Sequence, residues 1–328
     1  MRTTTAVKCE RMAHSKKGTI ILSEPVASKK AFFDSIGKSG GFAIIGGHAK
    51  SPCEDGGFFV ESNGKGKENA RALFGVFDAM RRREPVYALT SILVKAAAKK
   101  AREDPTAFGD ELLLAAHLAF KESSLWSAFP PELRQGSAAC AGGVREANGN
   151  GSVCWIGDCR AYIVRDPIQA ELITNDHSTI NIPLLDRIGK SGRALFFNPD
   201  CLEEIVHKNP EVQRTMFMDY VSSRSGLSRF IGKEELWSDA GAQSVIFHLG
   251  PGDYVVLVSD GIGDVMTKKD VAGCVHGNLP DLAAKMLILE SQKRNNEGKK
   301  YRNKYGQHVL GKQDDKIAVI YRQPLLGE

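Results

Sequence analysis

Short apolar runs rich in β-branched and aromatic residues recur along the chain, a pattern typical of β-strands. The pattern predicts strands within residues 18–26, 42–50, 56–62, 72–78, 137–166, 170–176, 244–261 and 314–322. Turn-forming residues at 147–151 (ANGNG) and 250–253 (GPGD) predict hairpins in the two longest of these segments. Because such short turns join antiparallel strands, we expect antiparallel sheet.

Helices are expected where apolar residues recur at helical spacing, at 86–102, 110–123, 281–294 and near 200–221. A further short helix is expected at 28–37, ending at Gly37. The polar and basic segment 295–313 is expected to be a loop. Together these elements predict one α+β domain in which helices cover the outer faces of the sheet.

Composition narrows the functional classes. Of the 328 residues, 42% are hydrophobic and 25% are charged, which is ordinary for a soluble globular protein with a sizeable core. The formal charge of +5 favours acidic partners, phosphoproteins included. This charge is too modest to predict nucleic-acid binding, which would require a concentrated basic patch.

The seven cysteines are odd in number and form no Cys-x-x-Cys pair, which indicates free thiols in a reducing compartment. The first residues contain no apolar signal segment, and no run is long enough to span a bilayer. We therefore expect a cytoplasmic or nuclear protein with neither a membrane nor a nucleic-acid partner.

Acidic residues stand at the ends of five strand-like runs. Asp78, Asp158 and Asp260 each end such a run, while Glu54-Asp55 and Asp314-Asp315 each precede one. A carboxylate beside buried strand surface is unfavourable unless something neutralises it. Five such positions predict carboxylates that converge on hard divalent cations, and all-oxygen ligation suits Mg²⁺ or Mn²⁺.

An ordered series of segments then carries a family resemblance. The segments are CEDGGFFV, FGVFDAM, GSAACAGG, WIGDCRAYI, LITNDHS, SRSGLSRFIG, VVLVSDGIGD and DDKIAVI. The series resembles the metal-dependent Ser/Thr protein phosphatases of type 2C. The resemblance covers residues 18–322 and implies a four-layer α-β-β-α sandwich, with two antiparallel sheets flanked by helices. It also implies a monomer in which residues 178–230 form a flap. Outside this domain, the sequence predicts a loose arm at 1–17 and a tail at 323–328.

The resemblance implies a role for each acidic residue. Asp78 would bridge two cations, and the backbone carbonyl of Ala79 together with Glu54 would serve the second of them. Asp260 and Asp315 would complete the ligand shell of the first cation.

The remaining implied roles concern water and a further cation. Asp55 would hold cation-coordinated water, and Asp158 with Asp264 resembles a third cation site found in some members. The implied reaction is hydrolysis of phosphoserine and phosphothreonine in phosphorylated proteins. Its nucleophile would be a hydroxide that bridges two Mg²⁺ or Mn²⁺ ions, and no phosphoenzyme would form.

Two departures from the family pattern leave an alternative open. Lys50 stands where the family has a phosphate-gripping arginine, and lysine lacks the bidentate fork. Ala79 and Arg81–Arg83 occupy the loop where the family has glycines, and one of these arginines could replace the missing phosphate contact. The alternative function is a pseudophosphatase, a phosphoprotein-binding or scaffold module without turnover.

Two other phosphatase classes are alternatives. Cys154–Arg160 and Cys159–Arg165 have the Cys-x5-Arg spacing of cysteine phosphatases, but both pairs lie in strand-like sequence without a following helix start. Hydrolysis of a small phosphorylated molecule is the other possibility, and it would favour a deep closed pocket over a shallow surface site.

Overall fold

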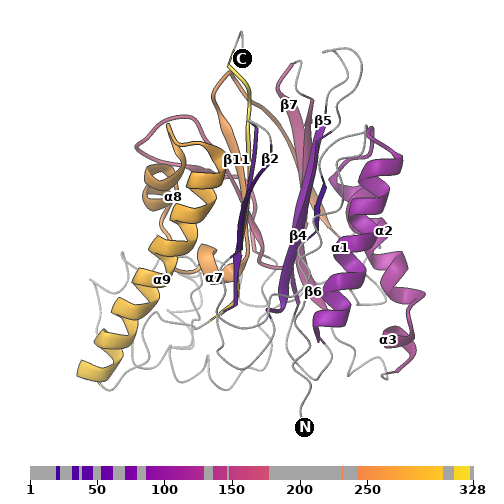
Figure 1. Ribbon diagram of the computed structural model, residues 1–328, viewed down its shortest axis with the longest axis horizontal. Helices are drawn as coiled ribbons and strands as arrows, with labels where there is room; N and C mark the ends of the chain where they lie inside the picture. Colours follow the sequence, from indigo (N-terminus) through magenta and orange to yellow (C-terminus); the bar gives the residue numbers. More distant parts are fainter. Residues whose placement is uncertain are drawn as a thin grey trace, which may run out of the picture.

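The structure is a computed structural model. It describes residues 20–22, 32–36, 39–46, 53–61, 71–79, 86–128, 136–145, 148–176, 231, 242–305 and 314–325. Within these residues two six-stranded sheets lie face to face, and every pair of neighbouring strands is antiparallel (Figure 1).

The first sheet has the order β1-β4-β5-β6-β7-β10 and the second β2-β3-β12-β11-β8-β9. The strands of the first sheet are β1 (Ile20–Leu22), β4 (Asp55–Glu61), β5 (Arg71–Ala79), β6 (Ser137–Arg145), β7 (Asn150–Ile156) and β10 (Gln243–His248). The strands of the second sheet are β2 (Phe32–Ile36), β3 (Gly40–Ile45), β12 (Lys316–Arg322), β11 (Tyr254–Val258), β8 (Arg160–Val164) and β9 (Glu171–Leu172).

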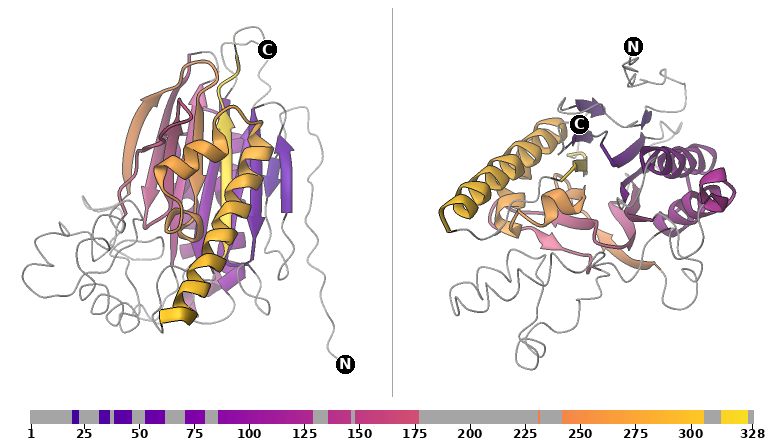
Figure 2. Two further views of the ribbon diagram at one scale, coloured as in Figure 1. Left: turned by 90° about the vertical axis from the view of Figure 1, so that its left-hand side faces the viewer. Right: turned by 90° about the horizontal axis from the view of Figure 1, so that it is seen from below.

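Helices cover the outer face of each sheet (Figures 1 and 2). The helices on the first sheet are α1 (Val86–Glu103) and α2 (Gly109–Lys121), which the four-residue α3 (Ser124–Ser127) follows. The helices on the second sheet are α7 (Asp260–Gly263), α8 (Lys268–Val275) and α9 (Pro280–Tyr305). The expected four-layer α-β-β-α sandwich is therefore confirmed. None of the described helices is both long enough and apolar enough to cross a membrane.

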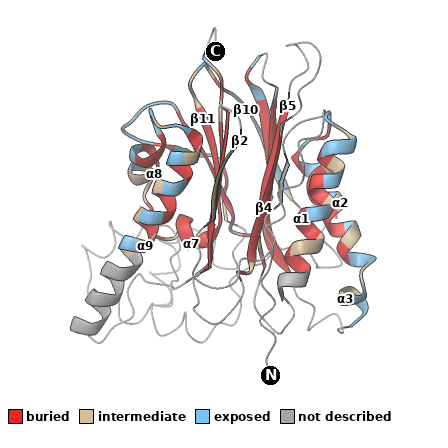
Figure 3. Cartoon of the chain, in the orientation of Figure 1, coloured by how far each residue is buried: buried red, intermediate tan, exposed pale blue. Residues whose placement is uncertain are grey.

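Side chains on β4 and β5 alternate between two cores. Phe59 and Phe74 lie in the core between the sheets, where their ring centroids are 5.9 Å apart and Phe74 also stacks on Tyr321 at 6.0 Å. Phe58 and Phe77 lie in the core beneath α1 and α2. Figure 3 shows the same division, since the strands and the inner faces of the helices are buried while the outer helical faces are exposed.

Several local expectations were wrong. The helix expected at 28–37 is replaced over Phe32–Ile36 by β2, which pairs with β3. Pairing with a neighbouring strand overrides a weak local helix pattern there. The loop expected at 295–313 is helical as far as Tyr305, because α9 continues past residue 294. The expected helix near 200–221 lies outside the described residues.

The segment 244–261 is not a hairpin. Its first strand, β10, pairs with β7 in the first sheet, whereas its second strand, β11, pairs with β8 and β12 in the second. The GPGD turn therefore carries the chain from one sheet to the other. The chain also crosses between the sheets after β7, whereas the turn at 147–151 does join the neighbouring strands β6 and β7 as expected.

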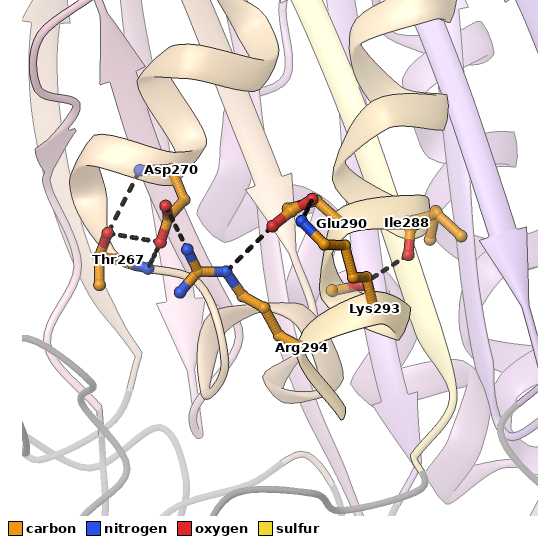
Figure 4. Close-up of polar contacts among 7 residues, drawn as sticks. Thr267, Asp270, Ile288, Glu290, Lys293 and Arg294 are labelled. Atoms are coloured by element: carbon orange, nitrogen blue, oxygen red, sulfur yellow. Dashed lines mark hydrogen bonds and ion pairs between the residues drawn. The ribbon is translucent and has the colours of Figure 1, made fainter. Parts of the chain in front are cut away.

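The helix α8 was not predicted from the sequence. A network of polar contacts fixes its N-terminus (Figure 4). Thr267 caps the helix by accepting the N–H of Asp270, and Asp270 accepts the N–H of Thr267 in return, at 3.2 and 2.8 Å. Arg294 of α9 donates to the same Asp270 carboxylate at 2.5 Å and lies 3.4 Å from Glu290. This network joins α8 to α9 on the outer face of the second sheet.

His117 of α2 makes the stability of the fold depend on pH. The side chain is 2% exposed and packs edge-on against Trp126, with ring centroids 6.2 Å apart. Burial, with a smaller contribution from Lys121, lowers the pKa of His117 from 6.5 to about 4. Between these pH values the unfolded chain binds a proton at His117 that the folded chain does not bind. The contribution of neutral His117 to the unfolding free energy is therefore fully present above pH 6.5 and is lost as the pH falls toward 4.

We expect the wild type to lose up to about 3 kcal/mol of unfolding free energy across this interval, relative to a His117→Gln variant. Urea unfolding at a series of pH values measures the difference. The variant serves as the control because it keeps a polar side chain that does not titrate. Parallel pH profiles for the two proteins would contradict the prediction.

Candidate active site

The alternation of side chains places carboxylates at one end of the core between the sheets. Asp55 continues the inward-facing row of Phe59 on β4, and Asp78 continues that of Phe74 on β5. The two aspartates are directly opposite each other in the β4–β5 register. Both rows of inward-facing side chains therefore end in an aspartate, at the lower end of the sandwich in Figure 1, where α7 lies.

Three carboxylates from distant parts of the chain meet at this end. Oxygen atoms of Asp78, Asp158 and Asp260 all lie within 4.8 Å of one another. Asp78 comes from the end of β5, Asp158 from the turn after β7, and Asp260 from the first residue of α7. The structure thus brings together three of the aspartates that the sequence analysis selected.

A second acidic group lies next to the first. Asp55 is 2% exposed and accepts a hydrogen bond of 2.6 Å from Oγ of Ser259. Asp315 is 5% exposed and accepts a hydrogen bond from the backbone N–H of Glu54. The Glu54 carbonyl in turn accepts a 2.5 Å bond from Thr90 of α1. Glu54 is half-buried, and its backbone is therefore held on one side by Asp315, which precedes β12, and on the other by Thr90 of α1.

Burial and like charge make this end of the molecule suited to a cation. The pKa of Asp55 is raised well above 3.8, first by burial and then by Asp315. The pKa of Asp78 is raised in the same way, first by burial and then by Asp55 and Asp260. Lys316 is one of the buried cationic residues near these carboxylates, but burial lowers its pKa and its Nζ donates to the carbonyl of Asp314 at 3.2 Å.

The donor set fits a hard divalent cation. Carboxylate oxygens are the preferred ligands of Mg²⁺ and Mn²⁺, and a dication would relieve the mutual repulsion of these aspartates. Cys53 and Cys159 border the acidic groups, but burial, followed by the nearby aspartates, raises the pKa of each thiol. Both thiols therefore remain protonated, which disfavours a soft-metal thiolate site.

Ala79 ends β5 beside the cluster, and Ser137 lies opposite it in the β5–β6 register. Oγ of Ser137 donates to the carbonyl oxygen of Asp78 at 3.0 Å. The backbone of Ser137 also exchanges hydrogen bonds of 3.0 and 2.8 Å with Ile231. Ser137 and Ser259 were not among the predicted site residues, although each lies within a segment that carries the family resemblance, GSAACAGG and VVLVSDGIGD respectively.

Asp264 does not belong to the three-carboxylate group. Its Oδ1 lies 2.9 Å from Nη2 of Arg160, which also forms a bidentate pair with Asp176. Lys50, Arg81–Arg83 and the flap expected at 178–230 lie outside the described residues. Ile231, the residue that follows the expected flap, is described.

Neither cysteine of the two Cys-x5-Arg pairs is suited to act as a nucleophile. Cys154 is 2% exposed, and burial raises its pKa to about 12. Cys159 is 1% exposed, and its pKa is likewise raised. A thiol that stays protonated at neutral pH is a poor nucleophile, so neither cysteine suits covalent phosphoryl transfer.

The chain is similar to known proteins both in its sequence profile and in its fold. The sequence profile of the family described as Protein phosphatase 2C matches residues 43–300. Among solved structures, the chain is similar to the Mycobacterium tuberculosis serine/threonine phosphatase PstP/Ppp, at 18% identity and a TM-score of 0.56, covering 90% of this chain and 99% of that chain.

Two further solved structures show the same similarity of fold. The S. agalactiae serine/threonine phosphatase is 18% identical, with a TM-score of 0.54 and coverage of 89% of this chain and 98% of that chain. The PPM Ser-Thr phosphatase MsPP from Mycobacterium smegmatis, solved in complex with cacodylate, is 19% identical, with a TM-score of 0.52 and coverage of 88% and 98%. No curated protein sequence matches the chain. Because the family profile spans most of the sequence, the chain belongs to the protein phosphatase 2C family of metal-dependent serine/threonine phosphatases.

Proposed function

We propose that the chain hydrolyses phosphoserine and phosphothreonine in proteins at the acidic end of the sandwich. The observation that carries the proposal is the convergence of Asp78, Asp158 and Asp260, whose oxygen atoms lie within 4.8 Å of one another. These residues come from three separate elements, the end of β5, the turn after β7 and the start of α7, and no packing requirement of the core explains why all three are acidic. The family match supplies the reaction class.

The proposed ligands follow from position. Asp78, Asp158 and Asp260 would hold Mg²⁺ or Mn²⁺, with Asp315, the Glu54 carboxylate and the Ala79 carbonyl completing the shells of two ions. Bound there, the cations would lower the pKa of coordinated water and neutralise charge on the phosphoryl oxygens.

The other residues would orient the reactants. Asp55, held in place by Ser259, would accept a hydrogen bond from the attacking water and align it with the phosphorus atom. Lys50 would bind the phosphoryl group as a point charge. The described cysteines are all free and buried, which is consistent with a reducing compartment such as the cytoplasm.

The test is hydrolysis of p-nitrophenyl phosphate and of phosphothreonine and phosphotyrosine peptides. We expect turnover with Mn²⁺ or Mg²⁺ that EDTA abolishes, that iodoacetamide leaves unchanged, and that favours the phosphothreonine peptide. A folded protein that binds the phosphothreonine peptide but shows no turnover at any cation concentration would identify the pseudophosphatase instead. The changes at Lys50 and Arg81–Arg83 are the observation that favours this second function.

A further inference from the structure

A buried arginine lies beside the acidic cluster and has no role in the function proposed above. Arg160 begins β8, two residues after Asp158, and its side chain is 2% exposed. Its guanidinium donates to both carboxylate oxygens of Asp176, from Nε at 3.0 Å and from Nη2 at 2.6 Å. The same Nη2 donates to Oδ1 of Asp264 at 2.9 Å. One buried cation therefore binds two carboxylates.

The guanidinium packs against the turn that carries Asp260. α7 is a single helical turn, and the N–H of Asp264 at its end donates to the carbonyl oxygen of Asp260 at 2.8 Å. A Cβ on Gly263 would lie 2.7 Å from Nη1 of Arg160, so any larger residue would displace the guanidinium. Arg160 thus packs closely against α7 at Gly263 and binds the carboxylate of Asp264, the residue that follows the helix.

Arg160 is also tied to the turn that carries Asp158. Asp158 lies in the connection between β7 and β8, which Gly157 opens with a φ of 91°, a conformation that favours glycine, and Arg160 is the first residue after this connection. Across the sheet, Arg160 is opposite Val258, the last residue of β11 before the chain enters α7. Arg160 therefore links the two segments that supply Asp158 and Asp260, because its backbone follows the Asp158 turn and its side chain binds Asp264 at the end of α7.

The chemistry of the contact requires arginine. Burial alone would lower the pKa of Arg160, but Asp176 and Asp264 reverse this effect, and the pKa is raised, so the side chain stays charged. A planar guanidinium matches a carboxylate bidentately and has donors left for a second partner, whereas an ammonium group is a point charge without that fork.

We propose, on the basis of the proposed function, that Arg160 is a positioning residue of the cation site and holds the Asp158 and Asp260 turns at the separation that a divalent cation needs. Asp176 and Asp264 are the anchors of Arg160, and Asp264 acts on the cations through Arg160 instead of as a direct ligand. Losing the guanidinium fork lets the two turns separate and weakens cation binding.

Mn²⁺ affinity of the full chain without substrate tests the proposal. Isothermal titration calorimetry compares the wild type with Arg160→Lys, Asp264→Asn and the double variant. Arg160→Lys keeps the charge but not the fork, and we expect its Kd for Mn²⁺ to rise about tenfold. Asp264→Asn is expected to weaken binding less in the Arg160→Lys background than alone, since its partner has already been lost.

Arg165→Lys is the matched control. Arg165 lies just beyond the other end of β8, where it pairs with Glu171 and Asp253 and is 43% exposed. Its replacement should leave the Kd for Mn²⁺ unchanged. Melting temperatures in EDTA show whether a variant is merely less stable, because a purely structural defect would lower them without changing the Kd.

The outcomes separate the two proposals. A Kd for Arg160→Lys within about twofold of the wild type overturns the positioning role, since outer-sphere partners typically change affinity by about 10–100-fold. Additive losses in the double variant also overturn it, because they identify Asp264 as a direct ligand. A wild type that binds no Mn²⁺ would contradict the proposed function itself. If Arg160→Lys does not fold, Asp176→Asn replaces it with the same expectation, because it removes the charged partner that fixes the fork.

Discussion

Replacing Asp78 with asparagine is expected to lower phosphatase turnover about a thousandfold or more, because the cations contribute several kcal/mol of transition-state stabilisation and about 4 kcal/mol corresponds to three orders of magnitude. Asp78 is one of the three converging carboxylates and is directly opposite Asp55, so it lies between the two acidic groups. Steady-state hydrolysis of p-nitrophenyl phosphate over a range of Mn²⁺ concentrations measures the loss. Turnover that saturating Mn²⁺ restores fully would contradict the assignment of Asp78 as an essential ligand.

The same substitution is expected to stabilise the cation-free protein. Burial and then Asp55 raise the pKa of Asp78 above 3.8, so the folded state binds a proton that the unfolded state has already released. Stability contributed by the protonated form is therefore lost as the pH rises from 3.8 through the folded-state pKa, and asparagine avoids this loss. We expect the melting temperature of Asp78→Asn in EDTA to exceed that of the wild type by roughly 2–6 °C at neutral pH.

Asp166→Asn is the matched control for both effects. Asp166 lies in the exposed turn after β8 and accepts the backbone N–H groups of Ile168 and Gln169, at 2.8 and 3.1 Å. Like Asp78, Asp166 lies near the end of a strand, but its carboxylate stabilises a turn. Turnover in this variant should be unchanged, and its melting temperature in EDTA should not rise. An increase equal to that of Asp78→Asn would show that the gain does not come from relieving repulsion at the cation site.

Adding Mn²⁺ to the cation-free wild type should raise the melting temperature by roughly 5–10 °C, since a ligand at about 100 times its Kd stabilises the folded state by about 2.7 kcal/mol. The physical reason is the acidic end itself, where Asp55, Asp78 and Asp260 are half-buried or buried and repel one another. EDTA should reverse the shift. The shift should also grow as the pH rises, because protons and cations compete for the same carboxylates.

The Asp78→Asn protein is the control for this measurement as well. In EDTA it should melt above the wild type, whereas in saturating Mn²⁺ the order should reverse, because the variant has lost a ligand and gains less from the cation. Differential scanning calorimetry of both proteins with and without Mn²⁺ provides the comparison. A wild type with the same melting temperature in EDTA and in Mn²⁺ would contradict the presence of a cation site at this end of the sandwich.

Alternating and helical patterns predicted most elements because those patterns report which faces are buried. The alternation in β4 and β5 separates residues that face the second sheet from residues that face the helices, and helical spacing in α1 and α2 marks their buried sides. Short local patterns failed where contacts with neighbouring elements decided the outcome. Phe32–Ile36 forms a strand because β3 pairs with it, and α9 continues to Tyr305 in spite of its polar sequence.

The turns show the limit of local reasoning most clearly. ANGNG and GPGD both mark a reversal of the chain, and both do reverse it. Only the first joins neighbouring strands of one sheet, because β10 and β11 find their partners in different sheets. A turn signal reports backbone conformation over four or five residues, and it contains no information about the strand on which the next segment will pack.

The sequence by itself predicted that aspartates lie at the ends of strands, that the sheets are antiparallel and, through the family resemblance, that the chain is a metal-dependent phosphatase. Only the tertiary structure decided which aspartates meet. Asp78, Asp158 and Asp260 converge, whereas Asp264 turns to Arg160, 104 residues away in the chain. The reason is that an ion pair between buried groups depends on distances in space, and spacing along the chain does not encode those distances until the two sheets have packed.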